Sequence, residues 1–155
     1  MQTLLLDNFI NRFEADLLIR LYEKNEHLSF KFRDVYPLSI FENNLTQAKF
    51  LVEKLNSITA PKKAVVDWIQ IVKWPKGSKQ ALHFDKLSDK TVLTSVCYLN
   101  DDYGGGQTYF KDGTQFAPKS GRIIFFDGKY YKHGVKQITN RTRYVASAWY
   151  KYKTN

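Results

Sequence analysis

Two histidines and one aspartate constrain the fold of this chain more than any other residues. His83 and Asp85 lie two positions apart, and His133 follows fifty positions after His83. Residues i and i+2 of a β-strand point to the same face, so His83 and Asp85 can reach one ion while Phe84 faces away. Two imidazoles and one carboxylate form the facial triad of non-haem Fe(II) sites. The spacing therefore predicts two strands that face each other across a barrel or sandwich, with His133 on the second.

The composition fits a folded, β-rich protein. A chain of 155 residues, taken as one domain over 1–155, buries roughly two thirds of its unfolded surface. Aromatic residues make up 15% of the chain, which suits strands better than disorder. Apolar runs are short, so we expect no membrane partner and no signal peptide. Cys97 is the only cysteine, which favours a reducing, cytoplasmic setting.

The formal net charge of +9 leaves several interpretations open. A positive field attracts nucleic acid, acidic proteins and small carboxylates alike. A solvated basic surface without a specific partner explains the same charge equally well. The charge alone does not choose between these interpretations.

Residues 1–60 carry the helical signals. Asn11 and Glu14 have the spacing of a capping box, and apolar residues then recur at helical intervals. A second stripe of apolar residues has the same period. The expected elements are a strand at Leu4–Leu6, helices after Asn11 and from about Leu45 to Ile58, and a loop or irregular strands over 28–44.

From Val65 onward, short β-branched and aromatic runs alternate with turns. Helices followed by many antiparallel strands predict an α+β fold with a double-stranded β-helix (jelly-roll) core over 65–151. The N-terminal helices would buttress one sheet. The expected strands are Val65–Trp74, Thr91–Asn100, Thr108–Lys111, Gly121–Phe126, Tyr130–His133 and Arg143–Tyr152.

Motifs in the β-rich part occur in a fixed order. They are Lys73–Gly77 before His83-Phe84-Asp85, then Thr94–Asp101, Gly105–Phe110, Pro118–Phe126, and His133–Val135 followed by Arg143 and Trp149. In this order and spacing, residues 65–151 resemble the Fe(II)- and 2-oxoglutarate-dependent dioxygenases. Within that family they resemble the prolyl-4-hydroxylase-like branch and its small stand-alone microbial or viral members. Each motif is weak alone, and the ordered series carries the resemblance.

The resemblance implies a role for each matching position. Arg143 would pair with the distal carboxylate of 2-oxoglutarate, because its planar fork makes two parallel charged hydrogen bonds. Alternation places Arg143 on the same strand face as Val145, Ser147 and Trp149. Dioxygen would be the second co-substrate, with ascorbate as an accessory reductant. The implied Fe(II) ligands are His83, Asp85 and His133, and the implied further co-substrate contacts are Tyr98, Thr94 and Trp74.

Three positions need separate comment. Trp74 stands where family members often have a tyrosine, and an indole donates one N–H but cannot replace a hydroxyl. Gln107 stands in place of a glutamate and removes one charge from its hairpin. Arg141 has the strand parity of Arg143 and is a reserve candidate for the co-substrate, although it lies near a turn.

The resemblance implies hydroxylation of a C–H bond while 2-oxoglutarate is decarboxylated to succinate. The leading substrate is a peptidyl residue such as proline, on a protein or peptide. The alternative is oxidation or demethylation of nucleic acid or another anionic substrate, which the net charge favours. A third interpretation is a non-catalytic jelly-roll module, against which the intact triad and Arg143 argue. The loops over 28–44 and 76–90 are expected to select the substrate.

Overall fold

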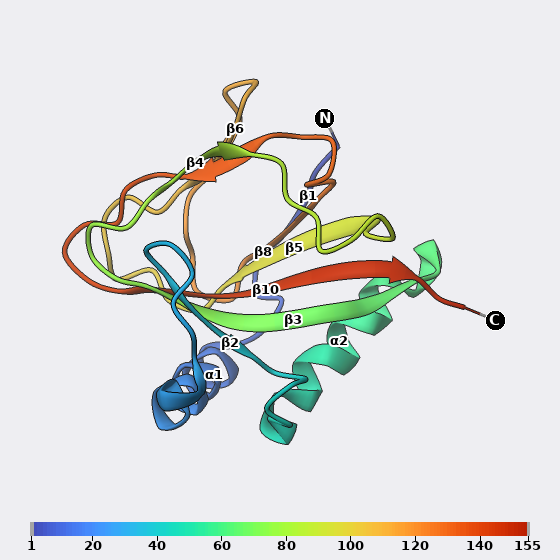
Figure 1. Cartoon of the computed structure of the whole chain (residues 1–155), viewed down its shortest axis with the longest axis horizontal. Helices are drawn as coiled ribbons and strands as arrows, with labels where there is room; N and C mark the ends of the chain where they lie inside the picture. The colour runs from blue at the N-terminus through green and yellow to red at the C-terminus, as the bar shows by residue number, and fades with distance from the viewer. Residues whose placement is uncertain (1, 155) are drawn as a thin grey trace.

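Two antiparallel sheets face each other in the computed structural model, which describes residues 2–154 (Figure 1). The larger sheet has the strand order β1-β8-β5-β10-β3-β2, and the smaller has the order β4-β9-β6-β7. This arrangement, with two helices outside the larger sheet, confirms the α+β jelly roll expected from the sequence. The strands are β1 (Leu4–Leu6), β2 (Tyr36–Ser39), β3 (Ala64–Trp74), β4 (Gln80–His83), β5 (Leu93–Tyr98), β6 (Thr108–Phe110), β7 (Gln115–Phe116), β8 (Ile123–Phe126), β9 (His133–Val135) and β10 (Arg143–Tyr152).

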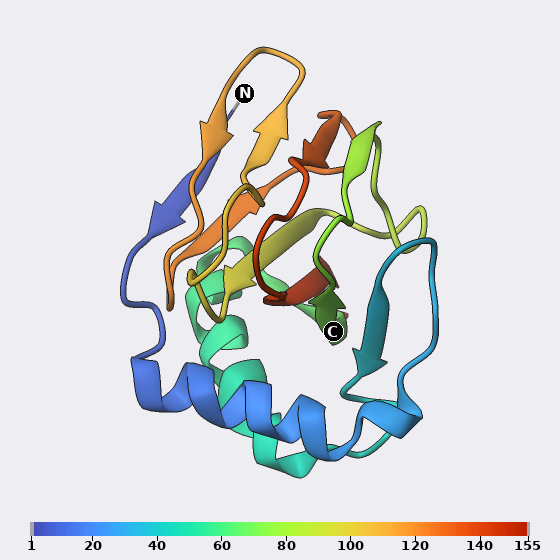
Figure 2. The same ribbon diagram turned by 90° about the vertical axis from the view of Figure 1, so that its left-hand side faces the viewer.

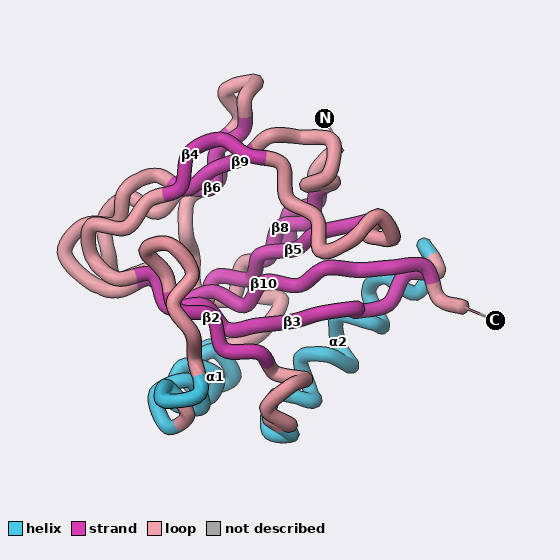
Figure 3. The backbone as a smooth tube through the Cα atoms, in the orientation of Figure 1, coloured by secondary structure: helices cyan, strands magenta, loops and turns pink. Residues whose placement is uncertain are grey.

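Both helices lie on the face of the larger sheet that points away from the smaller one (Figure 2, Figure 3). They are α1 (Arg12–Lys24) and α2 (Lys49–Thr59). The capping box of α1 is confirmed, since Asn11 Oδ1 accepts from the Glu14 N–H at 2.8 Å and Glu14 accepts in return. A short 3-10 turn over Thr46–Ala48 precedes α2, so the α-helix begins four residues later than expected.

Strand β10 separates two cores because its side chains alternate between two faces. Ala146, Ala148 and Tyr150 pack on the helix side with buried residues of α1 and α2, such as Leu18 and Leu51. The opposite face packs between the sheets with Trp74, Tyr98, Val135 and Val145. The expected inward face of the last strand is therefore the face that looks toward the smaller sheet.

Cys97 belongs to the helix-side core. Its side chain is buried, and burial raises the pKa of the thiol to about 12. The residue is therefore a protonated, unreactive core thiol at neutral pH.

Two segments differ from the sequence predictions. The strand expected at Tyr130–His133 begins at His133 instead, because the N–H groups of Tyr130 and Tyr131 both donate to the Asp127 carbonyl and form a turn. The segment over 28–44 contains the regular strand β2. Among residues 2–154, none of the helices has the length and apolar character needed to cross a membrane.

Leu55→Ala should lower the free energy of unfolding by about 2–5 kcal/mol, because Leu55 is buried in the helix-side core. Ile58→Ala on the same helix is the control, since the Ile58 side chain is 41% exposed, and it should cost less than about 1 kcal/mol. Urea denaturation of the two variants measures the difference. Equal losses would mean that α2 does not pack on the sheet through Leu55.

Candidate metal centre

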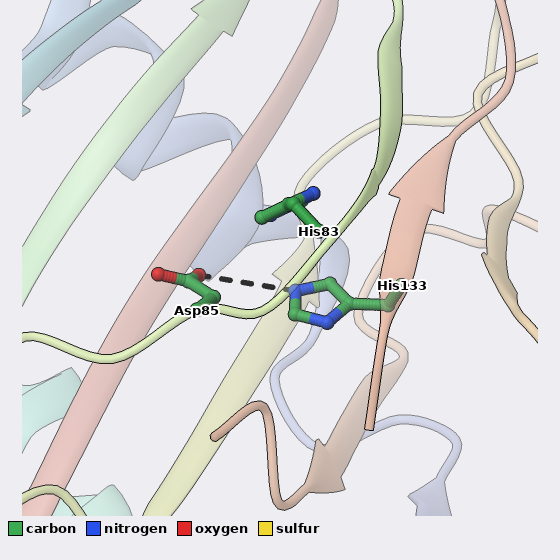
Figure 4. A group of neighbouring side chains, drawn as sticks. All are labelled: His83, Asp85 and His133. Carbon is green, nitrogen blue, oxygen red and sulfur yellow. Dashed lines mark ion pairs between the residues drawn. The ribbon is translucent and has the colours of Figure 1, made fainter. Parts of the chain in front are cut away.

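Three side chains converge between the sheets near the end of β4 (Figure 4). The His83 and His133 rings have centroids 4.5 Å apart, and His133 Nε2 lies 3.8 Å from Asp85 Oδ2. One ligand atom from each of His83, Asp85 and His133 lies within 4.8 Å of the other two. Two imidazoles and a carboxylate at these separations can hold one divalent metal ion and leave other positions open.

The expectation that His133 reaches this cluster from a strand across a sandwich is wrong. Strands β4 and β9 are neighbours in one sheet, and His83 lies directly opposite His133 in their register. Directly opposed side chains on adjacent antiparallel strands lie about 5 Å apart. This register therefore brings the two imidazoles close enough to bind the same metal ion. Asp85 lies beyond the end of β4 and is held by its N–H, which donates to the Gly128 carbonyl at 2.8 Å.

Backbone carbonyls orient both imidazoles. His83 Nδ1 lies 2.8 Å from the Ala81 carbonyl oxygen, and His133 Nδ1 lies 3.1 Å from that of Tyr131. Each Nδ1 can therefore carry the proton and donate, which leaves Nε2 as the free ligand atom. Burial also lowers the pKa of His83, and the neutral imidazole is the form that binds metal.

Arg143, the first residue of β10, is a buried cation without an acidic partner. Its side chain is 1% exposed, and its Nε and Nη1 atoms are buried without a hydrogen-bond partner. Among residues 2–154 no carboxylate lies within 4 Å of the guanidinium. An unpaired buried charge is costly, so the interior between the sheets is suited to an anionic ligand.

Aromatic and hydroxyl side chains surround this cation. The Arg143 Cζ atom lies 4.7 Å from the Trp74 ring centroid and 5.5 Å from that of Tyr98. The Trp74 Nε1 donor is buried without a partner, whereas the Tyr98 hydroxyl bonds to Thr108 Oγ1 at 2.5 Å. Trp74 and Tyr98 thus lie at the Arg143 end of the interior, and their contact with the co-substrate stays a prediction.

Thr94 lies at the other end of the interior, beside the histidines. Its buried Oγ1 atom has no partner, and a Cβ added at Gly128 would lie 3.1 Å from that oxygen and 3.2 Å from His133 Cε1. Gly128 therefore occupies the point where Thr94, His133 and the Asp85 carbonyl meet. A larger residue there would push these groups apart, a constraint that sequence reasoning did not detect.

Tyr103 is the other site residue that sequence reasoning missed. Its hydroxyl is buried without a partner, and burial raises the pKa of the phenol although the charge of Arg143 opposes the shift. Both side chains pack around Gly106, where an added Cβ would lie 2.6 Å from the Tyr103 ring and 3.3 Å from Arg143 Cδ. Tyr103 is thus a protonated donor beside the guanidinium. Tyr103 lies in a polar, glycine-rich loop, whose sequence has no periodicity that would indicate a site residue.

Arg141, the reserve candidate, does not face inward. Its side chain is 72% exposed and its Nη1 atom lies 3.5 Å from Asp102 Oδ2. Gln107 accepts a backbone hydrogen bond from the Lys136 N–H through its own carbonyl. Ser147 and Trp149 line a cavity of about 450 Å³ together with Trp74, His83 and Asp85.

Comparison with known proteins agrees with this geometry. A model of the 2OG-Fe(II) oxygenase superfamily matches residues 69–151, more than half of the chain. A candidate prolyl 4-hydroxylase of Acanthamoeba polyphaga mimivirus is 30% identical over 85 residues. That match spans 48% of this chain and 35% of the length of the viral protein.

Solved structures share the fold over almost the whole chain. The viral collagen prolyl hydroxylase of Paramecium bursaria Chlorella virus-1, solved as a 2OG complex, has a TM-score of 0.82 at 21% identity and covers 99% of this chain and 97% of its own. A Trichoplax adhaerens prolyl hydroxylase, solved with a hypoxia inducible factor peptide, has a TM-score of 0.82 at 17% identity and covers 96% and 83%. The chain belongs to the 2OG-Fe(II) oxygenase superfamily, whose cofactors are Fe(II) and 2-oxoglutarate (2OG).

Proposed function

We propose that this protein hydroxylates a C–H bond of a peptidyl residue, with proline as the leading candidate, while 2OG is decarboxylated to succinate. One observation carries the proposal: two members of a two-histidine, one-carboxylate cluster line the same cavity as Trp74, and the Trp74 ring contacts a buried arginine that has no acidic partner among residues 2–154. A metal ion and a dicarboxylate together would satisfy both features. A non-catalytic module would have no reason to keep an uncompensated buried charge.

We assign the Fe(II) to His83, Asp85 and His133. The donor set fits a facial triad, and the carbonyl-held Nδ1 atoms leave both Nε2 atoms free to bind the ion. When bound, the iron supplies the activation of dioxygen that oxidises 2OG and the substrate. The protein orients the ligands and keeps His133 buried against the Phe126 ring, whose centroid is 4.6 Å away.

We assign the distal carboxylate of 2OG to the pocket around Arg143. The guanidinium, the Trp74 indole and the Tyr103 phenol each have a buried donor without a protein partner. A carboxylate accepts several hydrogen bonds, and bonds to a charged donor are the strongest. Thr94 would lie toward the metal end. Tyr98 would contribute through its ring, because its hydroxyl is already engaged.

The peptide substrate is supported by the three relatives described above, all of which are named as prolyl hydroxylases and one of which was solved with a peptide. The nucleic-acid alternative rests on the net charge of +9. The single oxygenase domain over 1–155 and the cytoplasmic location stay predictions.

Asp85→Ala and His133→Ala should each abolish Fe(II)-dependent conversion of 2OG to succinate, because two remaining ligands cannot hold the ion in a facial site. Succinate release, together with a +16 Da mass shift on co-expressed peptides, measures the reaction. Asp89→Ala is the matched control, since that carboxylate is exposed and pairs with Lys86. Retained turnover in His133→Ala would contradict the ligand assignment.

Arg143→Met should weaken 2OG binding by about a hundredfold or more, while Arg141→Met, two positions away and exposed, should change it less than about twofold. Anaerobic titration of the Fe(II) protein, followed by charge-transfer absorption, measures the affinity. The ligand-free Arg143→Met variant should melt no lower than the parent, because the substitution removes an unpaired buried charge. Equal effects of both variants would contradict the assignment of the distal carboxylate to Arg143.

Tyr103→Phe should weaken 2OG binding about threefold to tenfold, the usual effect of one lost hydrogen bond. The same titration measures it. Tyr130→Phe is the control, because Tyr130 is exposed on a turn. Unchanged affinity in Tyr103→Phe would show that the phenol does not reach the carboxylate.

A further inference from the structure

Two hollows meet at Phe84 and together form one surface, here named the aromatic groove. The first is the 450 Å³ cavity that contains His83 and Asp85, and the second has about 590 Å³. Phe84 lines both. Phe30, Phe32 and Arg33 also line the first hollow, and Lys111, Tyr130 and Lys132 line the second.

Exposed apolar side chains concentrate along this groove. Thirteen large hydrophobic side chains are exposed among residues 2–154, and six of them line the two hollows. Such a concentration on a small protein marks a binding surface more often than chance scatter does. The six are Phe30, Phe32, Phe84, Leu87, Tyr130 and Tyr131.

The groove runs along backbone that suits an extended ligand. Strands β2 and β4 are the end strands of the two sheets, and Pro37 of β2 and Gln80 of β4 both line the first hollow. In Figure 1 the turn before β2 rises from the larger sheet on the side of the smaller sheet. End strands and aromatic walls are the features by which proteins bind extended peptides, including those that contain proline.

The charged groups of the groove are mostly cationic. Arg33, Lys111 and Lys132 have no ion-pair partner among residues 2–154. The Arg33 guanidinium lies 5.5 Å from the Phe32 ring centroid, and Lys132 Nζ lies 5.3 Å from that of Phe84. Arg33 therefore lines the same hollow as His83 and Asp85, and Lys132 lies over the ring of Phe84, the residue between these two metal ligands.

The acidic groups of the groove do not offset these cations. Asp85 belongs to the metal cluster, and Asp112 accepts a hydrogen bond from the Thr114 N–H in its own turn. Lys86 is the one cation of the groove with a partner, Asp89. An anionic ligand would thus meet cations in both hollows.

We propose that the aromatic groove binds an extended acidic peptide segment, which places its target residue over His83 and Asp85. This inference rests on the proposed function and names its substrate class. A peptide is favoured over a nucleic acid because, apart from Arg33, Lys86 and the metal ligands, the first hollow is lined by apolar or neutral residues such as Val72, Ser147 and Trp149. A nucleic-acid backbone carries a charge at every residue and needs a continuous cationic track.

Fluorescence anisotropy with short labelled peptides tests the inference on the full chain loaded with Fe(II) and 2OG without air. Three peptides share a central proline flanked by glutamate, serine or lysine, and a single-stranded oligonucleotide of similar length is the fourth probe. The glutamate peptide should bind at least about tenfold more tightly than the lysine peptide at low salt, with the difference shrinking as salt rises.

Arg33→Gln and Lys132→Gln should each weaken binding of the glutamate peptide about threefold to tenfold, as expected for one flanking charge. Lys49→Gln is the matched control, because Lys49 lies on α2 and its side chain is 75% exposed. It should change the affinity less than about twofold.

Equal affinity for the glutamate and lysine peptides would overturn the inference, as would tighter binding of the oligonucleotide or an equal effect of Lys49→Gln. The charge-transfer absorption of the same samples reports on the metal and 2OG separately. A normal absorption without peptide discrimination would reject the acidic-peptide groove and leave the proposed function standing. A missing absorption would reject the proposed function itself.

Discussion

Strand β10 lies between β5 and β3 in the larger sheet. The packing of its two faces determines on which side the helices lie and on which side the polar interior lies. One face joins the helices in a continuous apolar core. The other begins with Arg143, whose guanidinium contacts the rings of Trp74 and Tyr98. The same strand thus anchors the fold and carries a charge into its interior. The helices can supply stability on one side because the chemistry is confined to the other.

The pocket around Arg143 has a consistent chemical character. Trp74 places an aromatic face against the cation, which stabilises a charge without neutralising it. Trp74 and Tyr103 both offer neutral donors, so a bound carboxylate would meet one full positive charge and no competing acceptor. The tryptophan in place of the more usual tyrosine is compatible with this design, because Tyr103 supplies a hydroxyl from a different segment of the chain.

Much of the fold and of the candidate site could be predicted from the sequence, wherever local periodicity or an ordered series of motifs indicated it. The capping box of α1 and the inward parity of Arg143 follow from helix and strand geometry alone. The pairing of His83 with His133 did not follow, because sequence spacing is the same for strands that lie side by side and for strands that face each other. Tyr103 and Gly128 lie in irregular loops, where function depends on tertiary contacts that have no period.

The uncompensated charge of Arg143 also bears on the stability of the folded chain. A ligand that binds only the native state stabilises it by about 2.7 kcal/mol at a hundredfold excess over its Kd. For a protein of ordinary marginal stability, that gain changes the unfolded fraction about a hundredfold. The proposed 2OG pocket would therefore make the stability of the folded chain depend on the concentration of a ligand as well as on the packing of its core.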